Sequence, residues 1–168
     1  MYNGLMYMDF EQEYFAAHQH GRYQRLDATL LPPLYVAFDP RRAEFSGTYH
    51  RNLRTQFDEH KPDIVAAMSE FADLARQGFE ALSTGRTERL PALINANFDL
   101  RDRVFRVSPE NKQMVEVARR SGASAKFAGS GGAIVGTYTD AAMLQALRRD
   151  LAGIGCELVL PDIGGTLA

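Results

Sequence analysis

Apolar residues recur along most of this chain at spacings typical of helices and strands. From Pro62 to Gly85 they follow a repeat of three to four residues, which predicts an amphipathic helix with proline at its first position. The same repeat follows several capping hydroxyl or carboxylate residues further along the chain. Four long helices are therefore predicted, beginning near Pro62, Thr87, Ser108, and Thr139 or Asp140.

Shorter runs of aromatic and β-branched residues predict strands. They are Met6–Phe10, Leu34–Phe38, Cys156–Leu160 and two runs within residues 123–138. Residues 11–19 predict one or two helical turns, and residues 27–33 an irregular connection. Strands and helices do not alternate strictly, which indicates an α+β fold with helices on one face of an antiparallel sheet. No internal repeat or low-complexity linker divides the chain, so residues 1–168 are expected to form a single domain.

Composition narrows the function classes. The chain has 168 residues, of which 45% are hydrophobic, enough for one sizeable core. The formal net charge of −2 gives no basic excess for binding nucleic acid. No apolar run is long enough to cross a bilayer, and no signal peptide is recognisable. We therefore expect a cytoplasmic protein with neither nucleic acid nor membrane as a partner.

The cysteine and histidine content does not predict a metal centre. Cys156 is the only cysteine and lies in a predicted strand, which favours an inert buried thiol. His18 and His20 are two positions apart, a spacing that places them on different helix faces. A solvated loop explains this histidine pair better, and no metal ligand is predicted.

The segment from Ala123 to Tyr138 contains two strand-like runs joined by Gly129-Ser130-Gly131-Gly132. Glycines allow the backbone to turn sharply and to approach another group closely. Consecutive amides in such a turn can form a concave anion site, so the segment predicts either a simple hairpin or a loop that faces phosphate. Lys126 lies three residues before the loop, where it could add positive charge.

Two polar residues interrupt the apolar face of the helix predicted after Thr87. Asn97 and Arg101 project into the same arc as its apolar residues, whereas Asn95, Asp99, Asp102, Arg103 and Arg106 are assigned to the solvent side. A buried amide or guanidinium needs hydrogen-bond partners. For Arg101 we weigh a carboxylate or phosphate ligand against a structural ion pair with a carboxylate such as Asp9.

Several segments resemble one kinase family. Lys126-Phe-Ala-Gly-Ser-Gly-Gly-Ala133 is similar to the third, C-terminal motif of the GHMP kinases. The segments Gly4–Phe10, Leu30–Tyr35 and Asn95–Arg101 resemble the glucuronokinase-like sugar kinases of that family. The family's first phosphate-binding motif, Pro-x-x-x-Gly-Leu-Gly-Ser-Ser-Ala, does not occur in this sequence. Its catalytic aspartate precedes a segment similar to Tyr2–Leu5 and is absent too, so no catalytic residue is expected here.

The resemblance implies a ferredoxin-like antiparallel sheet with helices on one face and an added helical segment. It implies a phosphate-side loop made by Lys126, Gly129, Ser130, Gly131 and Gly132. It also implies a sugar-side wall to which Asn97, Arg101, Ser46, Thr48 and His50 contribute. Ser46 or Thr48 could instead be simple helix N-caps.

Two functions remain open at this point. The first is the C-terminal half of an ATP-dependent sugar kinase that is inactive alone, with ATP and Mg²⁺ implied for the complete enzyme and no cofactor for the isolated chain. Its partners would be a sugar or uronic acid and either the missing N-terminal half or a second copy of the chain. The second is a stand-alone module that binds a sugar or another protein. If the other half is absent, the surface it would cover is expected to be apolar.

Overall fold

The structure is a computed structural model that describes residues 4–41, 47–105 and 107–163, with the backbone alone for residues 47–52. The strands and α-helices, in chain order, are β1 (Leu5–Asp9), α1 (Gln12–His18), β2 (Arg22–Leu26), β3 (Leu34–Phe38), α2 (Gly47–Asp58), α3 (Pro62–Ser83), α4 (Leu90–Val104), α5 (Pro109–Arg120), β4 (Lys126–Phe127), β5 (Ala133–Thr137), α6 (Ala141–Ala152) and β6 (Glu157–Val159). Two single 3₁₀ turns, Ala28–Leu30 and Thr87–Arg89, precede β3 and α4. Among the described helices, none is long and apolar enough to span a membrane.

Four strands form the main sheet in the order β4-β5-β3-β6, and every neighbouring pair is antiparallel. Taken in chain order from β3, this is the 4-1-3-2 arrangement of a ferredoxin-like β-α-β-β-α-β unit, in which β3 and β5 are central. The helices α2 to α5 are all inserted between the first and second strands of this unit. The predicted α+β, ferredoxin-like class is therefore confirmed, and the added helical segment is the α2–α4 insertion.

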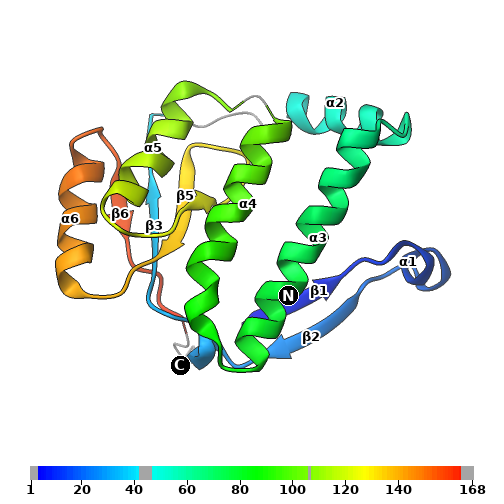
Figure 1. Cartoon of the computed structure of the whole chain (residues 1–168), viewed down its shortest axis with the longest axis horizontal. Helices are drawn as coiled ribbons and strands as arrows, with labels where there is room; N and C mark the ends of the chain where they lie inside the picture. The colour runs from blue at the N-terminus through cyan, green and yellow to red at the C-terminus, as the bar shows by residue number, and fades with distance from the viewer. Residues whose placement is uncertain (1–3, 42–46, 106, 164–168) are drawn as a thin grey trace.

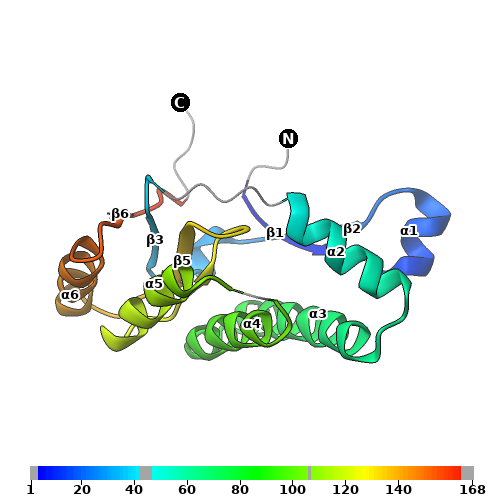
Figure 2. The same ribbon diagram turned by 90° about the horizontal axis from the view of Figure 1, so that it is seen from above.

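All of the long helices from α3 to α6 lie on one side of the sheet (Figures 1 and 2). The main core fills the space between them, and its largest fully buried side chains include Tyr35, Met114, Ile134, Leu147 and Leu151. These side chains are buried because alternate residues of β3 and β5 point into the core, and because α5 and α6 each turn an apolar face toward it. Cys156 is buried in the same core, as its position beside a strand predicts.

The hairpin of β1 and β2 packs beside this unit against α3 and α4. Tyr7 of β1 stacks on Phe79 of α3 with ring centroids 4.4 Å apart. A second small core contains Ala81, Leu82 and Leu90. Strand β2 was missed from sequence because its five residues, Arg22-Tyr-Gln-Arg-Leu26, are mostly polar and mostly exposed. Its strand conformation depends on backbone pairing with β1, which local composition does not show.

No described helix covers the other face of the main sheet (Figure 2). One row of side chains on that face crosses all four strands through the register pairs Lys126↔Val135, Val135↔Val36 and Val36↔Val159. Val159 is 46% exposed, and Leu160 beyond it is 43% exposed. This open face therefore presents an apolar strip, with Lys126 at one end.

The hydroxyl of Tyr35 predicts how stability responds to alkaline pH. Tyr35 is fully buried and its hydroxyl donates to the carbonyl oxygen of Ser124 at 2.8 Å. Burial raises the pKa of Tyr35 far above its ordinary value, and the charge of Arg119 opposes this shift less strongly. The unfolded chain releases this proton above about pH 10, whereas the folded chain retains it. Stability is therefore lost as the pH rises through that range, by up to about 1.4 kcal/mol per pH unit for this one proton.

The free energy of unfolding of the Tyr35→Phe variant should fall less steeply as the pH rises above about 10. At neutral pH the variant should be less stable by about 1 to 3 kcal/mol, because the Ser124 carbonyl loses this donor. Urea unfolding followed by circular dichroism at about pH 8 and about pH 11 measures both effects. Equal alkaline slopes for the two proteins would contradict the assignment to Tyr35.

Candidate functional site

The glycine-rich loop between β4 and β5 is held in place by Arg101 of α4. Its Nη1 donates to the carbonyl oxygen of Gly129 at 2.9 Å, and its Nη2 donates to that of Ser130 at 3.0 Å. The guanidinium also lies over the rings of Phe105 and Phe127, at 5.2 and 4.9 Å from their centroids. Arg101 and the loop, predicted separately from sequence, are therefore directly connected. The ion pair weighed for Arg101 is not formed with Asp9, which pairs with Arg22 instead.

The far end of the loop is fixed at Gly132. Its amide donates to Oδ1 of Asn111 at 2.9 Å, and its carbonyl accepts from the amide of Asp39 at 3.0 Å. Gly132 has φ of 72°, a conformation that glycine adopts without strain. Asp39 in turn forms a two-pronged ion pair with Arg41, whose Nε and Nη2 each lie 2.9 Å from a carboxylate oxygen. The loop is thus joined to α4, α5 and the end of β3.

These bonds leave one side of the loop available for a ligand. Among the residues that the structure describes, the amides of Gly129, Ser130 and Gly131 have no hydrogen-bond partner. Arg101 donates hydrogen bonds to carbonyl oxygens of the same segment, so the loop has bonded carbonyl oxygens and unused N–H groups. Consecutive unused amides are the donors of a backbone anion site. The hairpin and the anion loop are therefore compatible features of one segment.

Lys126 adds a desolvated charge next to this loop. Partial burial, and secondarily the positive charge of Arg101, lower the pKa of Lys126 below its ordinary value. Its Nζ donates to the carbonyl oxygen of Phe127 at 3.1 Å, and no ion pair to Lys126 exists among the described residues. A nearby anion would relieve both effects, because it would replace lost water and offset the guanidinium charge. The electrostatics here favour a negatively charged ligand.

Only some of the residues predicted to line the sugar side have described side chains. Asn97 lies half-buried on α4, one turn before Arg101, and its side chain forms no hydrogen bond within the described part of the chain. Ser46 lies outside the described residues. Thr48 and His50 belong to the first turn of α2, whose backbone alone is described. In both views the start of α2 lies beside the glycine-rich loop (Figures 1 and 2), and the roles of these two residues stay predictions.

Asn95 was assigned to solvent from sequence, and that prediction was wrong. Its Oδ1 accepts from the amide of Ala125 at 2.9 Å and from Nε of Arg119 at 3.1 Å. Arg119 also donates to the backbone carbonyl of Asn95 and to Asp99. The helical repeat placed Asn95 outside because it was counted from the apolar residues that face α3. Helix α4 buries a second side, marked by Phe98, against the main core, where its ring meets that of Phe127 with centroids 5.2 Å apart.

Asn111 was missed altogether, because a polar residue in the first turn of α5 resembles an ordinary solvated position. It is only 2% exposed. Replacing Asn111 with alanine removes the acceptor of the buried Gly132 amide, so we expect a loss of about 1 to 3 kcal/mol in unfolding free energy. The exposed neighbour Gln113→Ala is the matched control and should change stability by less than about 0.5 kcal/mol. Chemical unfolding of both variants makes the comparison, and equal stabilities would contradict the proposed anchor.

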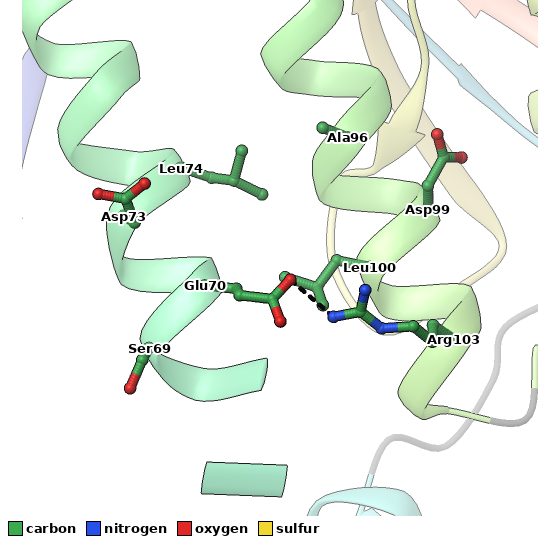
Figure 3. A pocket seen from close by; sticks show the side chains of 8 residues that line it. All are labelled: Ser69, Glu70, Asp73, Leu74, Ala96, Asp99, Leu100 and Arg103. Carbon is green, nitrogen blue, oxygen red and sulfur yellow. Dashed lines mark hydrogen bonds and ion pairs between the residues drawn. The ribbon is translucent and has the colours of Figure 1, made fainter. Parts of the chain in front are cut away.

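An open groove of 790 Å³ lies elsewhere, between α3 and α4. Figure 3 shows side chains from both helices pointing into it, with Glu70 and Arg103 bridging the two helices at 2.6 Å. None of the residues that line it belongs to the predicted site. Its remaining carboxylates, Asp73 and Asp99, pair with Arg76 and Arg119. Every charged side chain that lines the groove thus has a partner of opposite charge, so the candidate site stays at the glycine-rich loop.

The family comparison agrees with this geometry. Residues 79–153 match the family model described as GHMP kinases C terminal, a span that includes α4, α5, the β4–β5 hairpin and α6. Residues 79–153 are a GHMP kinase C-terminal domain. Both arginine-bound carbonyls and the Asn111 contact lie within the matched residues. The anchored loop is therefore a feature of this GHMP kinase domain.

Relatives of known sequence and structure extend the comparison. Glucuronokinase 1 of Arabidopsis thaliana is 40% identical over 138 residues, which are 80% of this chain and 38% of that protein. The fold is shared with L. major mevalonate kinase (TM-score 0.71, 18% identity, 86% of this chain and 47% of that one). It is also shared with Streptococcus pneumoniae phosphomevalonate kinase (TM-score 0.64, 18% identity, 89% of this chain and 47% of that one). This GHMP kinase domain thus spans less than half the length of the kinases it matches.

Proposed function

We propose that this chain is the C-terminal half of an ATP-dependent sugar kinase of the glucuronokinase type, which transfers a phosphoryl group to a sugar hydroxyl. The observation that carries the proposal is the loop at residues 129–132. It is anchored through its carbonyls, it has three unused amides, and it lies beside a lysine whose pKa is lowered. Phosphoryl transfer depends mainly on positioning and on charge stabilisation, which such a loop can supply.

The residues of this chain fit the phosphate side of such a reaction. The amides of Gly129, Ser130 and Gly131 would hold phosphate oxygens, and Lys126 would offset their charge. Arg101 would keep the loop in shape, while Asn97, with Thr48 and His50 on α2 and Ser46 before it, would line the sugar side. ATP with Mg²⁺ supplies the transferred group. Because the first phosphate motif and the catalytic aspartate do not occur in this sequence, we propose that the other half provides them.

The open face of the main sheet is the surface on which we expect the other half to dock. The row of side chains that crosses it is apolar on β5, β3 and β6 and ends on β4 at Lys126, which belongs to the proposed site. Glucuronokinase 1 is much longer than this chain, so a polypeptide of the required size exists in the relatives. A second copy of this chain is the alternative occupant, and light scattering at low protein concentration would then report a dimer.

Reconstitution tests the function. The 168-residue chain alone should not phosphorylate glucuronate with ATP, whereas the chain with the remaining portion of glucuronokinase 1, fused or co-expressed, should. Turnover by the chain alone would contradict the proposal that it is incomplete. If the two halves associate stably but phosphorylate no sugar of a panel of uronic acids and neutral sugars, the proposed sugar kinase activity would be contradicted.

A stand-alone sugar-binding module is the second candidate, favoured by Asn97, whose half-buried side chain forms no hydrogen bond within the described residues and lies one helical turn before Arg101. Calorimetric titration of the isolated chain with millimolar glucuronate distinguishes it. Heat that disappears in Asn97→Ala would support an autonomous sugar site. If the titration gives no heat, the isolated chain does not bind the sugar, and sugar binding requires the assembled kinase.

A further inference from the structure

The arm formed by β1, α1 and β2 carries two histidines whose rings lie together, far from the glycine-rich loop (Figure 1). His18 ends α1, and Gln19 follows in the left-handed conformation with φ of 60°. This residue reverses the chain direction, so that His20 returns alongside the helix. The ring centroids of His18 and His20 are 6.0 Å apart, although their spacing in sequence predicts different faces.

The hydrogen bonds of both rings select the tautomer that can bind a metal. Nδ1 of His18 lies 3.0 Å from the carbonyl oxygen of Tyr14, and Nδ1 of His20 lies 2.9 Å from that of Gly21. A carbonyl oxygen can only accept, so each Nδ1 carries the proton and each neutral ring keeps its lone pair on Nε2. Histidine ligands of metals show this same pattern, because the bonded N–H fixes the ring orientation.

The surroundings hold the pair in position without blocking it. Tyr14 stacks on His18 with centroids 4.1 Å apart and meets the edge of His20 at 5.8 Å. The guanidinium of Arg22 lies over Tyr14, but its charge is offset by Asp9 and Glu11 at 3.2 and 3.5 Å. Both histidine side chains are exposed, so an ion can reach them from solvent.

We propose that His18 and His20 together bind a divalent transition-metal ion through their Nε2 atoms. With metal–nitrogen bonds of about 2 Å, two imidazoles on one ion have centroids about 5 Å apart, so the two rings, whose centroids are 6.0 Å apart here, approach each other when the ion binds. Within the described part of the chain no group of three or more His, Cys, Asp or Glu residues is arranged to hold a metal ion, so we expect water to complete the coordination. Imidazole suits copper, nickel and zinc, and Cu²⁺ should bind more tightly than Zn²⁺.

Metal titration of the tag-free 168-residue chain tests this site, using Cu²⁺ and Zn²⁺ separately in a calorimeter. We expect one ion per chain, and a loss of affinity of about tenfold or more in His18→Ala and in His20→Ala. Acidification should weaken binding, because protons compete for the same lone pairs. Both substitutions are at exposed positions, and circular dichroism melting checks that the fold is retained.

His60 provides a matched control. Its Nδ1 also lies against a carbonyl oxygen, that of Asp58 at 2.8 Å, and in the described residues no second histidine ring contacts it. His60→Ala should leave the affinity unchanged. Unaltered binding in both His18→Ala and His20→Ala, or an equal loss in His60→Ala, would overturn the proposal. The result is independent of the kinase function, because the site does not share a residue with the loop.

Discussion

Replacing Gly136 with alanine is expected to prevent stable folding. Gly136 lies in the central strand β5, where an added Cβ would overlap the carbonyl oxygen of Ser124 and lie 2.9 Å from Cε1 of Tyr35. The overlap is with backbone, which cannot move without breaking the Tyr35–Ser124 hydrogen bond and displacing β4. Because overpacking and the lost bond add, we expect a loss of about 4 kcal/mol or more.

Circular dichroism melting and urea unfolding measure this effect, and Gly78→Ala is the control. Gly78 lies in α3, and a Cβ added there would meet no neighbouring atom within 4 Å. Alanine at this position should stabilise the chain by about 0.5 to 1 kcal/mol, since glycine is unfavourable inside a helix. A Gly136→Ala protein that melts like the parent would show that β5 and the Ser124 segment do not approach as described.

Loss of Arg101 is expected to have the largest effect on activity in the reconstituted kinase. In Arg101→Ala the carbonyls of Gly129 and Ser130 lose the donors that hold the loop. Small displacements of positioning groups reduce catalysis by about 100-fold, and we expect kcat/KM to fall by that order. Arg101→Lys should rescue little, because a single ammonium cannot reproduce the planar fork that reaches two carbonyls.

The pattern across substrates separates positioning from direct contact with a uronic acid. If Arg101 acts through the loop, kcat falls similarly for glucuronate and for any neutral sugar that is turned over. If it binds the substrate carboxylate, KM for glucuronate rises while kcat and the neutral sugar are unaffected. Since both Nη atoms are used by the loop, we expect the first result.

Two further measurements complete the Arg101 test. Hydrogen exchange of the isolated chain should accelerate at the Gly132 amide in Arg101→Ala, because the loop opens more often without its clamp. Arg103→Ala is the control on the same helix. Its exposed ion pair with Glu70 contributes about 0 to 1 kcal/mol, so activity and loop exchange should stay close to the parent.

Helices α3 to α6 were predictable because their signals are local, whereas helix α2 (Gly47–Asp58) was not predicted as a helix. The proline and the apolar repeat of α3 lie within one segment, and so do the Ser108 and Asp140 caps of α5 and α6, whose side chains accept from Asn111 and Met143. Strand β2 was not predictable in this way, since its partner β1 supplies the bonds that define it. The left-handed Gln19 that brings the histidine rings together gives no composition signal either.

The sequence alone determined the class of fold, the position of the glycine-rich loop and the two polar residues, Asn97 and Arg101, in an apolar helix face. Hydrophobic periodicity and glycine content are properties of short segments, so they can be recognised from the sequence without coordinates. Only the tertiary structure decided what those residues contact. Arg101 meets Gly129 across 28 residues, Asn111 meets Gly132 across 21, and Asn95 meets Ala125 across 30. Such bonds form between segments that folding brings together, and no local pattern encodes their pairing.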